Sequence, residues 1–108
     1  DDLFDRYRSS EDFIQKYIFP GGFLPSIHFM KNLMKKNNLN LLKINSYPDD
    51  YAKTLAIWRE NFFKTWNNIT PLGFDETFKR MWEFYLSYCE AGFKARNINL
   101  IQCSMSNK

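Results

Sequence analysis

The residues best suited to chemistry in this chain of 108 residues are two cysteines and one histidine. Cys89 and Cys103 lie far apart in the sequence, and no histidine is near either of them, so their spacing does not predict a metal site. His28 stands alone, and we expect a structural or surface role for it. Ring-bearing side chains are therefore the more informative group.

Aromatic residues make up 19% of the chain, with eleven Phe, six Tyr and three Trp. Two interpretations remain open. The rings could form an aromatic-rich core, as large apolar side chains usually do. They could also line a site for an apolar or cationic ligand, because ring faces attract positive charge.

The formal net charge of +3 and the isoelectric point near 8.9 are mildly basic. Lys31, Lys35 and Lys36 form the nearest approach to a basic cluster. A solvated helix end accounts for them, and attraction to anionic lipid head groups is the alternative. No nucleic-acid-binding motif accompanies the charge, so nucleic acid is not an expected partner.

Cysteine usage and hydropathy bear on the cellular compartment of the protein. Two cysteines without a signal peptide indicate a reducing compartment. No apolar run approaches the roughly 20 residues of a membrane-spanning helix. We therefore expect a soluble or peripheral protein.

The sequence predicts about four helices and two strands, which must position the cysteine, histidine and aromatic side chains. Capping residues, apolar periodicity and Pro/Gly breaks place the boundaries. The expected helices run from Ser9-Ser10 to the stop at Pro20-Gly21-Gly22, from Pro25-Ser26 to Lys36, from Pro48 through Trp66, and from Asp75 to Arg96; the expected strands are Leu39–Ile44 and Ile98–Cys103.

Both expected strands are apolar on their two faces. Strands of this kind are typically covered on both sides within a layered sheet, which predicts an α/β fold. Two strands alone make a marginal sheet, so part of that sheet is expected to be missing from the chain. Exposed strands also predict self-association, so a homo-oligomer is kept among the expected partners.

Three blocks of sequence resemble the cyclopropane-fatty-acyl-phospholipid synthases and the related mycolic acid cyclopropane synthases. The first is DFIQKYIFPGG at residues 12–22, followed by LPS at 24–26. The second is DYAKTL at residues 50–55, with Trp58, Phe62 and Trp66 after it. The third joins Gly73-Phe74, FKRM at 78–81, Tyr85-Leu86, Cys89 and GFKAR at 92–96. Together they cover the chain from about Asp12 to Gln102.

This resemblance implies the C-terminal part of a Rossmann-like, S-adenosylmethionine-dependent methyltransferase. Residues 1–108 would then be one segment of a single domain, without the cofactor-binding half and inactive alone. In the intact enzyme, a methyl group would pass from S-adenosylmethionine to a cis double bond of a phospholipid acyl chain, and a bound bicarbonate would take a proton so that a cyclopropane ring closes. The implied partners are phospholipid acyl chains and the membrane surface, at the inner face of a cytoplasmic membrane.

The resemblance also assigns site residues. Tyr51 matches the family's bicarbonate-binding tyrosine, and a phenol can donate a hydrogen bond to an oxyanion without adding charge. Asp50 stands where the family often has histidine, which changes the local electrostatics. Cys89 matches a cysteine suggested for the active site, although its apolar surroundings favour a packing role. Phe19, Gly21 and Gly22 are expected beside the acyl chain, with an ordinary helix stop as the alternative.

Two other functions remain open from the sequence. A stand-alone helical module could bind a partner or a membrane through its aromatic stripe, without catalysis. A related methyltransferase could act on a different lipid or amine, because this fold accommodates many substrates. Neither the lipid nor the product, a cyclopropane or a methyl branch, is determined by the sequence.

Overall fold

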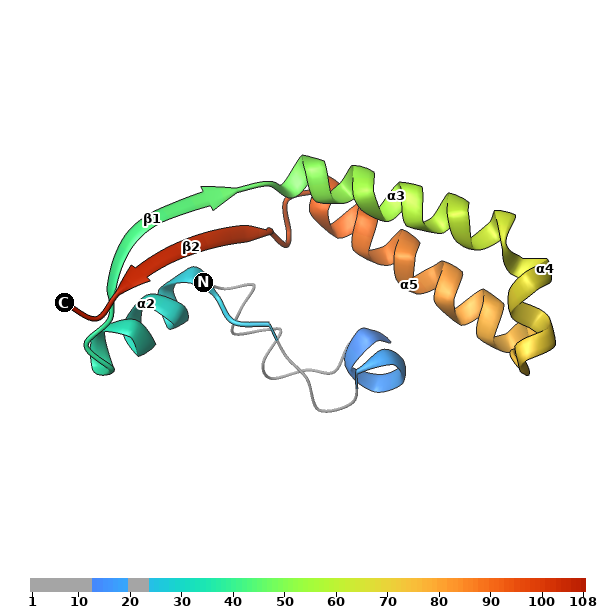
Figure 1. Ribbon diagram of the computed structural model, residues 1–108, viewed down its shortest axis with the longest axis horizontal. Helices are drawn as coiled ribbons and strands as arrows, with labels where there is room; N and C mark the ends of the chain where they lie inside the picture. The colour runs from blue at the N-terminus through green and yellow to red at the C-terminus, as the bar shows by residue number, and fades with distance from the viewer. Residues whose placement is uncertain (1–12, 20–23) are drawn as a thin grey trace. The chain divides into compact units, whose positions relative to one another are not determined.

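The computed structural model describes residues 13–19 and 24–108, which form two compact units (Figure 1). The sheet unit contains the described residues up to Ser46 together with Ile101–Lys108, and the hairpin unit is Tyr47–Leu100. Within the described ranges no helix is long and apolar enough to cross a membrane.

The sheet unit begins with the π-helix η1 (Ile14–Ile18), followed by α2 (Ile27–Lys36). Ser26 caps α2, because its hydroxyl accepts a hydrogen bond from the Phe29 amide at 3.0 Å. The helix ends at Lys36, and Asn38 just beyond its cap has a φ of 58°, a left-handed conformation that asparagine tolerates. The predicted start of α2 at Pro25-Ser26 is confirmed, whereas the predicted start of the first helix at Ser9-Ser10 lies outside the described residues.

Strands β1 (Asn40–Ser46) and β2 (Ile101–Ser106) pair antiparallel, with Ile44 opposite Cys103. A shift in register falls between Leu41 and Lys43. Met34 of α2 is the buried side chain of that helix. The Leu42 side chain remains 66% exposed and the Met105 side chain 46% exposed in this pair.

The hairpin unit consists of two long helices lying side by side, α3 (Pro48–Lys64) and α5 (Glu76–Lys94) (Figure 1). Proline in the first turn of α3 and the acids that follow it favour a helix start at that point. Asp75 caps α5 by accepting from the Phe78 amide at 2.9 Å. The short helix α4 (Trp66–Ile69) and the 3₁₀ turn η2 (Thr70–Leu72) connect them.

Several predicted boundaries were wrong by two or three residues: β1 ends at Ser46 instead of Ile44, and α5 ends at Lys94 instead of Arg96. Two further differences have a visible cause. The long helix ends at Lys64 instead of running through Trp66, because the Thr65 hydroxyl bonds back to the Asn61 carbonyl oxygen at 2.8 Å. The second strand begins at Ile101 instead of Ile98, because the Ile98 amide bonds back to the Gly92 carbonyl oxygen in the turn that follows α5.

Gly92 allows this return of the chain. A Cβ atom at that position would approach the Ile98 side chain to 3.0 Å. Arg96, with φ at 64°, supplies the left-handed residue that ends the helix. Its guanidinium pairs with Asp49 at 2.8 Å, which ties the last turn of α5 to the first turn of α3.

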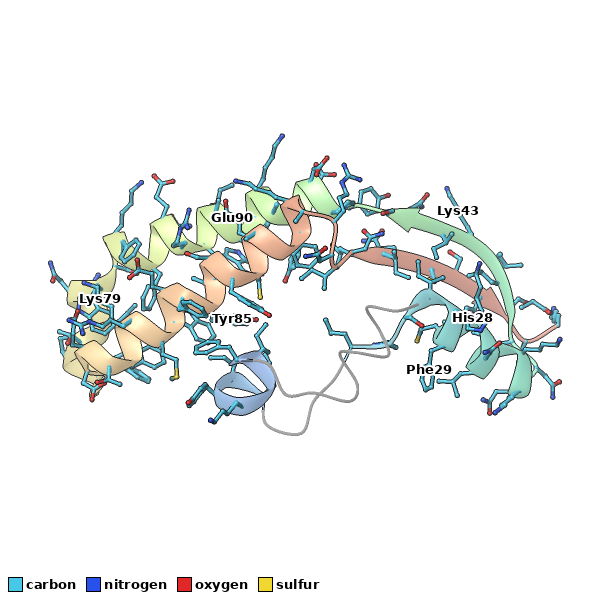
Figure 2. The ribbon with its side chains drawn as sticks, turned by 180° about the vertical axis from the view of Figure 1, so that it is seen from behind. His28, Phe29, Lys43, Lys79, Tyr85 and Glu90 are labelled. Atoms are coloured by element: carbon cyan, nitrogen blue, oxygen red, sulfur yellow. The ribbon has the colours of Figure 1, made fainter. Side chains whose placement is uncertain are left out.

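The core of the hairpin unit lies between α3 and α5. Its buried apolar side chains are Ala52, Leu55, Leu86, Cys89 and Phe93. Beside this core, Glu90 of α5 faces α3 (Figure 2). Its two carboxylate oxygens lie 3.1 Å from the Arg59 guanidinium and 2.8 Å from the Lys94 ammonium group. Arg59 also donates to the Ser87 hydroxyl at 2.9 Å, so one arginine joins the helices at two points.

Replacing Glu90 with glutamine tests this ion pair. The Glu90 side chain is 10% exposed, so Glu90→Gln removes a charge that two cations face in a poorly solvated position. Arg59 and Lys94 are themselves partly solvated, which moderates the cost. We expect the free energy of unfolding to fall by about 2 kcal/mol.

The matched control is Glu60→Gln, which breaks the exposed pair between Glu60 and Lys64 on the same hairpin. Exposed pairs contribute about 0–1 kcal/mol. Urea unfolding followed by circular dichroism measures both variants. Equal losses would show that Glu90 contributes no more than a surface charge.

Candidate functional site

Tyr51 lies in the first turn of α3, and its ring is held by two other rings. Its amide bonds to the Tyr47 carbonyl oxygen at 3.1 Å, which fixes its position at the helix start. The Tyr51 ring meets the Phe93 ring of α5 edge-on, with ring centroids 4.7 Å apart. It also meets the ring of Trp58, two turns further along α3, edge-on with centroids 5.8 Å apart. Edge-to-face contacts of this kind are favourable and directional, so they restrict the orientation of the phenol.

Tyr85 and Cys89 lie one turn apart on α5 and are hydrogen-bonded through their side chains. The pKa of Tyr85 is raised above its ordinary value, first by burial, then by the proximity of Cys89 and Tyr51, and then by this hydrogen bond. Tyr85 therefore remains a neutral phenol at physiological pH. Tyr51, Tyr85 and Cys89 together form what we call the phenol–thiol cluster.

The stripe that carries the cluster follows from helical spacing. Tyr85, Cys89 and Phe93 recur every four residues along α5, so they share one face of that helix. Tyr51 packs on Phe93, at one end of this stripe. At the other end Trp82 contacts Tyr85, with ring centroids 4.9 Å apart.

The cluster provides neutral hydrogen-bond donors beside aromatic rings. A phenol can donate to an anion without bringing a charge of its own. Trp58, which is 48% exposed, adds a ring face of the kind that attracts cations. The arrangement can therefore hold a small oxyanion near a developing positive charge.

The active-site role suggested for Cys89 stays a prediction. It is a free cysteine, only 7% exposed, within the core between α3 and α5. It also shares a hydrogen bond with Tyr85. No group of metal-binding side chains occurs in residues 13–19 and 24–108.

The remaining candidate residues belong to the sheet unit. Phe19 ends η1, is 57% exposed, and donates its amide to the Ile14 carbonyl oxygen at 2.7 Å. Gly21 and Gly22 lie outside the described residues. The expectation that these three residues adjoin an acyl chain stays a prediction.

Tyr85 and Trp58 are rings of the candidate site to which the sequence gave no individual role, although both lie in the resembling blocks. The available signal was the spacing of Tyr85 and Cys89 at i and i+4, which places a phenol next to a thiol on any helix. That spacing does not reveal Tyr51, because α3 and α5 come together only in the folded hairpin.

Comparison with known proteins places this geometry in a family. Residues 2–103 match the model of the mycolic acid cyclopropane synthetase family. The chain is 41% identical over 99 residues to the tuberculostearic acid methyltransferase of Mycobacterium tuberculosis, covering 91% of this chain and 23% of that protein. It is 35% identical over 96 residues to the cyclopropane-fatty-acyl-phospholipid synthase of Escherichia coli K12, covering 89% of this chain and 25% of that protein.

A solved structure agrees with these sequence matches. The structure of a cyclopropane synthase from Mycobacterium tuberculosis matches with a TM-score of 0.79 and 26% identity, covering 94% of this chain and 34% of that one. This confirms the predicted α/β methyltransferase fold. The chain spans about a quarter of the length of the curated relatives it matches. It belongs to the mycolic acid cyclopropane synthetase family.

Proposed function

We propose that the protein containing this chain transfers a methyl group from S-adenosylmethionine to the cis double bond of a phospholipid acyl chain and forms a cyclopropane ring. The observation that supports the proposal is the packing of the family-matched Tyr51 on Phe93 of α5, the helix face that also carries Tyr85 and Cys89. The names of the relatives support the reaction class and the lipid substrate.

The chemistry requires a base near a cation. Methyl transfer from a sulfonium would break the S–CH3 bond and release a neutral thioether, while the alkene π electrons form the new C–C bond and leave a positive charge on the neighbouring carbon. Ring closure then needs a base to remove a proton from the transferred methyl group. Tyr51 would donate a hydrogen bond to a bicarbonate that serves as this base. Tyr85 and Trp58 would border the same space with a neutral phenol and a ring face.

The carboxylate of Asp50, the residue before Tyr51, opposes binding of an anion at Tyr51. Its side chain is exposed at the start of α3, and its carbonyl oxygen accepts from the Thr54 hydroxyl at 3.1 Å. A carboxylate next to an anion site would weaken anion binding. The phenols of Tyr51 and Tyr85 would offset this effect by donating without charge.

The cofactor would be supplied by another part of the protein. A glycine-rich loop between a strand and a helix is the usual element for a Rossmann-like cofactor site. The described glycines, Gly73 and Gly92, instead end η2 and lie within α5. S-adenosylmethionine therefore does not fit the described residues. We propose that this chain is the C-terminal segment of a methyltransferase domain, as its share of the relatives' length supports.

The partners follow from the substrate. Acyl chains reside in bilayers, so we place the intact protein in the cytoplasm, peripheral to the inner face of the membrane. Association between copies is compatible with the exposed apolar residues of both strands.

Formation of a methyl branch is the second candidate reaction. It is favoured by the 41% identity to a protein described as a tuberculostearic acid methyltransferase. Both reactions begin with methyl transfer to the double bond and differ in the fate of the cation. Proton NMR of the product lipid distinguishes them, because ring protons appear only in a cyclopropane.

Removing the Tyr51 hydroxyl tests the proposed role in catalysis. In the intact enzyme, Tyr51→Phe should preserve the ring contacts with Phe93 and Trp58 and leave the melting temperature nearly unchanged. Turnover should fall roughly ten- to a hundredfold, the value of one hydrogen bond to an anion. Turnover measured over a range of bicarbonate concentrations checks this, and full activity at every concentration would return Tyr51 to a packing role.

A change at Cys89 should act chiefly through stability. Cys89→Ser keeps a hydrogen-bond partner for Tyr85 but places a hydroxyl in an apolar core. We expect the melting temperature to drop while the turnover of the folded fraction stays within about threefold. A variant that melts like the wild type but has lost turnover would assign chemistry to the thiol.

The isolated chain should not bind S-adenosylmethionine. Calorimetric titration should show no saturable heat, whereas the intact protein serves as the positive control. Circular dichroism of the same sample establishes that the helices are formed. A micromolar dissociation constant for the folded chain would contradict the proposal that the cofactor site lies elsewhere.

A further inference from the structure

Charge is divided unevenly between the two units. The hairpin unit carries seven Lys/Arg and seven Asp/Glu, so its formal net charge is zero. All five salt bridges between described residues lie within it. The formal charge of +3 on the whole chain is therefore carried by the sheet unit.

The described part of the sheet unit contains cations without acids. Its charged side chains are Lys16, Lys31, Lys35, Lys36, Lys43 and Lys108. By sequence, two arginines and five acids precede residue 13, outside the described residues. These cations lie on η1, α2 and β1, with Lys108 following the end of β2.

Helix α2 gathers three of these lysines on its solvent side. Lys31, Lys35 and Lys36 are exposed, and none of them forms a salt bridge with a described residue. Met34 is the buried side chain of α2, whereas these three lysine side chains are exposed to solvent. We call these three residues the α2 lysine face.

The helix dipole alone does not account for this face. Lys35 and Lys36 lie in the last turn of α2, where cations are favoured. Lys31 lies in the middle of the helix, one turn from Lys35, where like charges repel. Ile27 and Leu33, at the edges of the lysine face, are 40% and 42% exposed.

We propose that the α2 lysine face docks on the surface of an anionic phospholipid bilayer. Lysines near such a surface are attracted by its negative potential, and partly exposed apolar side chains beside them add contact with the interface. The proposal rests on the phospholipid substrate proposed above. Lys43 projects from β1 away from α2 and is not part of this face (Figure 2).

Vesicle binding by the intact protein tests the docking surface. The variant carries Lys31→Gln, Lys35→Gln and Lys36→Gln. The matched control removes three exposed cations of the hairpin unit with Lys53→Gln, Lys64→Gln and Arg80→Gln. Sedimentation measures the binding of each protein to vesicles of phosphatidylglycerol with phosphatidylcholine, and to phosphatidylcholine alone.

The wild type and the control should bind the anionic vesicles, whereas the α2 variant should bind roughly 10- to 100-fold more weakly. Raising the salt concentration should weaken wild-type binding and reduce this difference, because exposed charges are screened. Equal weakening of both variants would overturn the assignment to α2. Wild-type binding that ignores lipid charge would overturn the proposal entirely.

Activity on acyl lipid dispersed in neutral detergent separates this inference from the proposed function. The α2 variant should keep wild-type turnover on the dispersed lipid, because its substitutions change only the binding to a bilayer surface. A wild type that turns over dispersed lipid but ignores anionic vesicles would reject docking and keep the reaction. Charge-dependent binding through α2 without turnover on either lipid form would reject the reaction and keep the docking surface.

Discussion

Ala52 and Leu55 are each only 1% exposed because α5 covers the face of α3 on which they lie. Burial of these side chains against Leu86, Cys89 and Phe93 removes apolar surface from water, which is the main force that holds two amphipathic helices together. The hairpin aligns because its ends are also joined. At one end Arg96 pairs with Asp49. Toward the other end the ring centroids of Phe62 and Phe78 lie 6.3 Å apart. The candidate site depends on this packing, since Tyr51 and Tyr85 come from different helices.

The same packing explains why Cys89 is difficult to assign to a single role. A small, polarizable side chain fits the narrow space between α3 and α5, where a larger one would push the helices apart. Its thiol also satisfies a hydrogen bond with Tyr85 at the edge of the core. A residue in that position affects the orientation of a phenol through packing, even if it takes no part in a bond-forming step.

The two units differ in how their charged side chains are paired. In the hairpin unit, cations and anions are paired along and between the helices, including a carboxylate buried between α3 and α5. Pairing reduces the cost of placing charge beside an apolar core. In the sheet unit, the lysines of α2 face solvent without acidic partners among the described residues. Such charges remain available to an external anionic surface.

The amino-acid sequence by itself determined the helices, most of their starting points and the family. Ser26, Pro48 and Asp75 act on the turn that follows each of them, so local chemistry places the starts of α2, α3 and α5 within one or two residues. The three resembling blocks predicted the methyltransferase fold, which the comparisons confirmed. Helix ends and the second strand were less predictable, because a Thr65 side-chain bond and the return of Ile98 onto Gly92 decide them.

Only the tertiary structure decided which side chains meet. Tyr51 and Cys89 were both candidates from the sequence, but nothing in their spacing indicates that Tyr85 lies near both of them. The perturbed phenol arises from burial and from neighbours on a second helix, and these are properties of packing. Likewise, the sequence shows three lysines near one another, whereas the structure shows that all three are exposed while Met34 of the same helix is buried. Periodicity determines what one helix presents, but contacts between distant segments depend on how the helices pack.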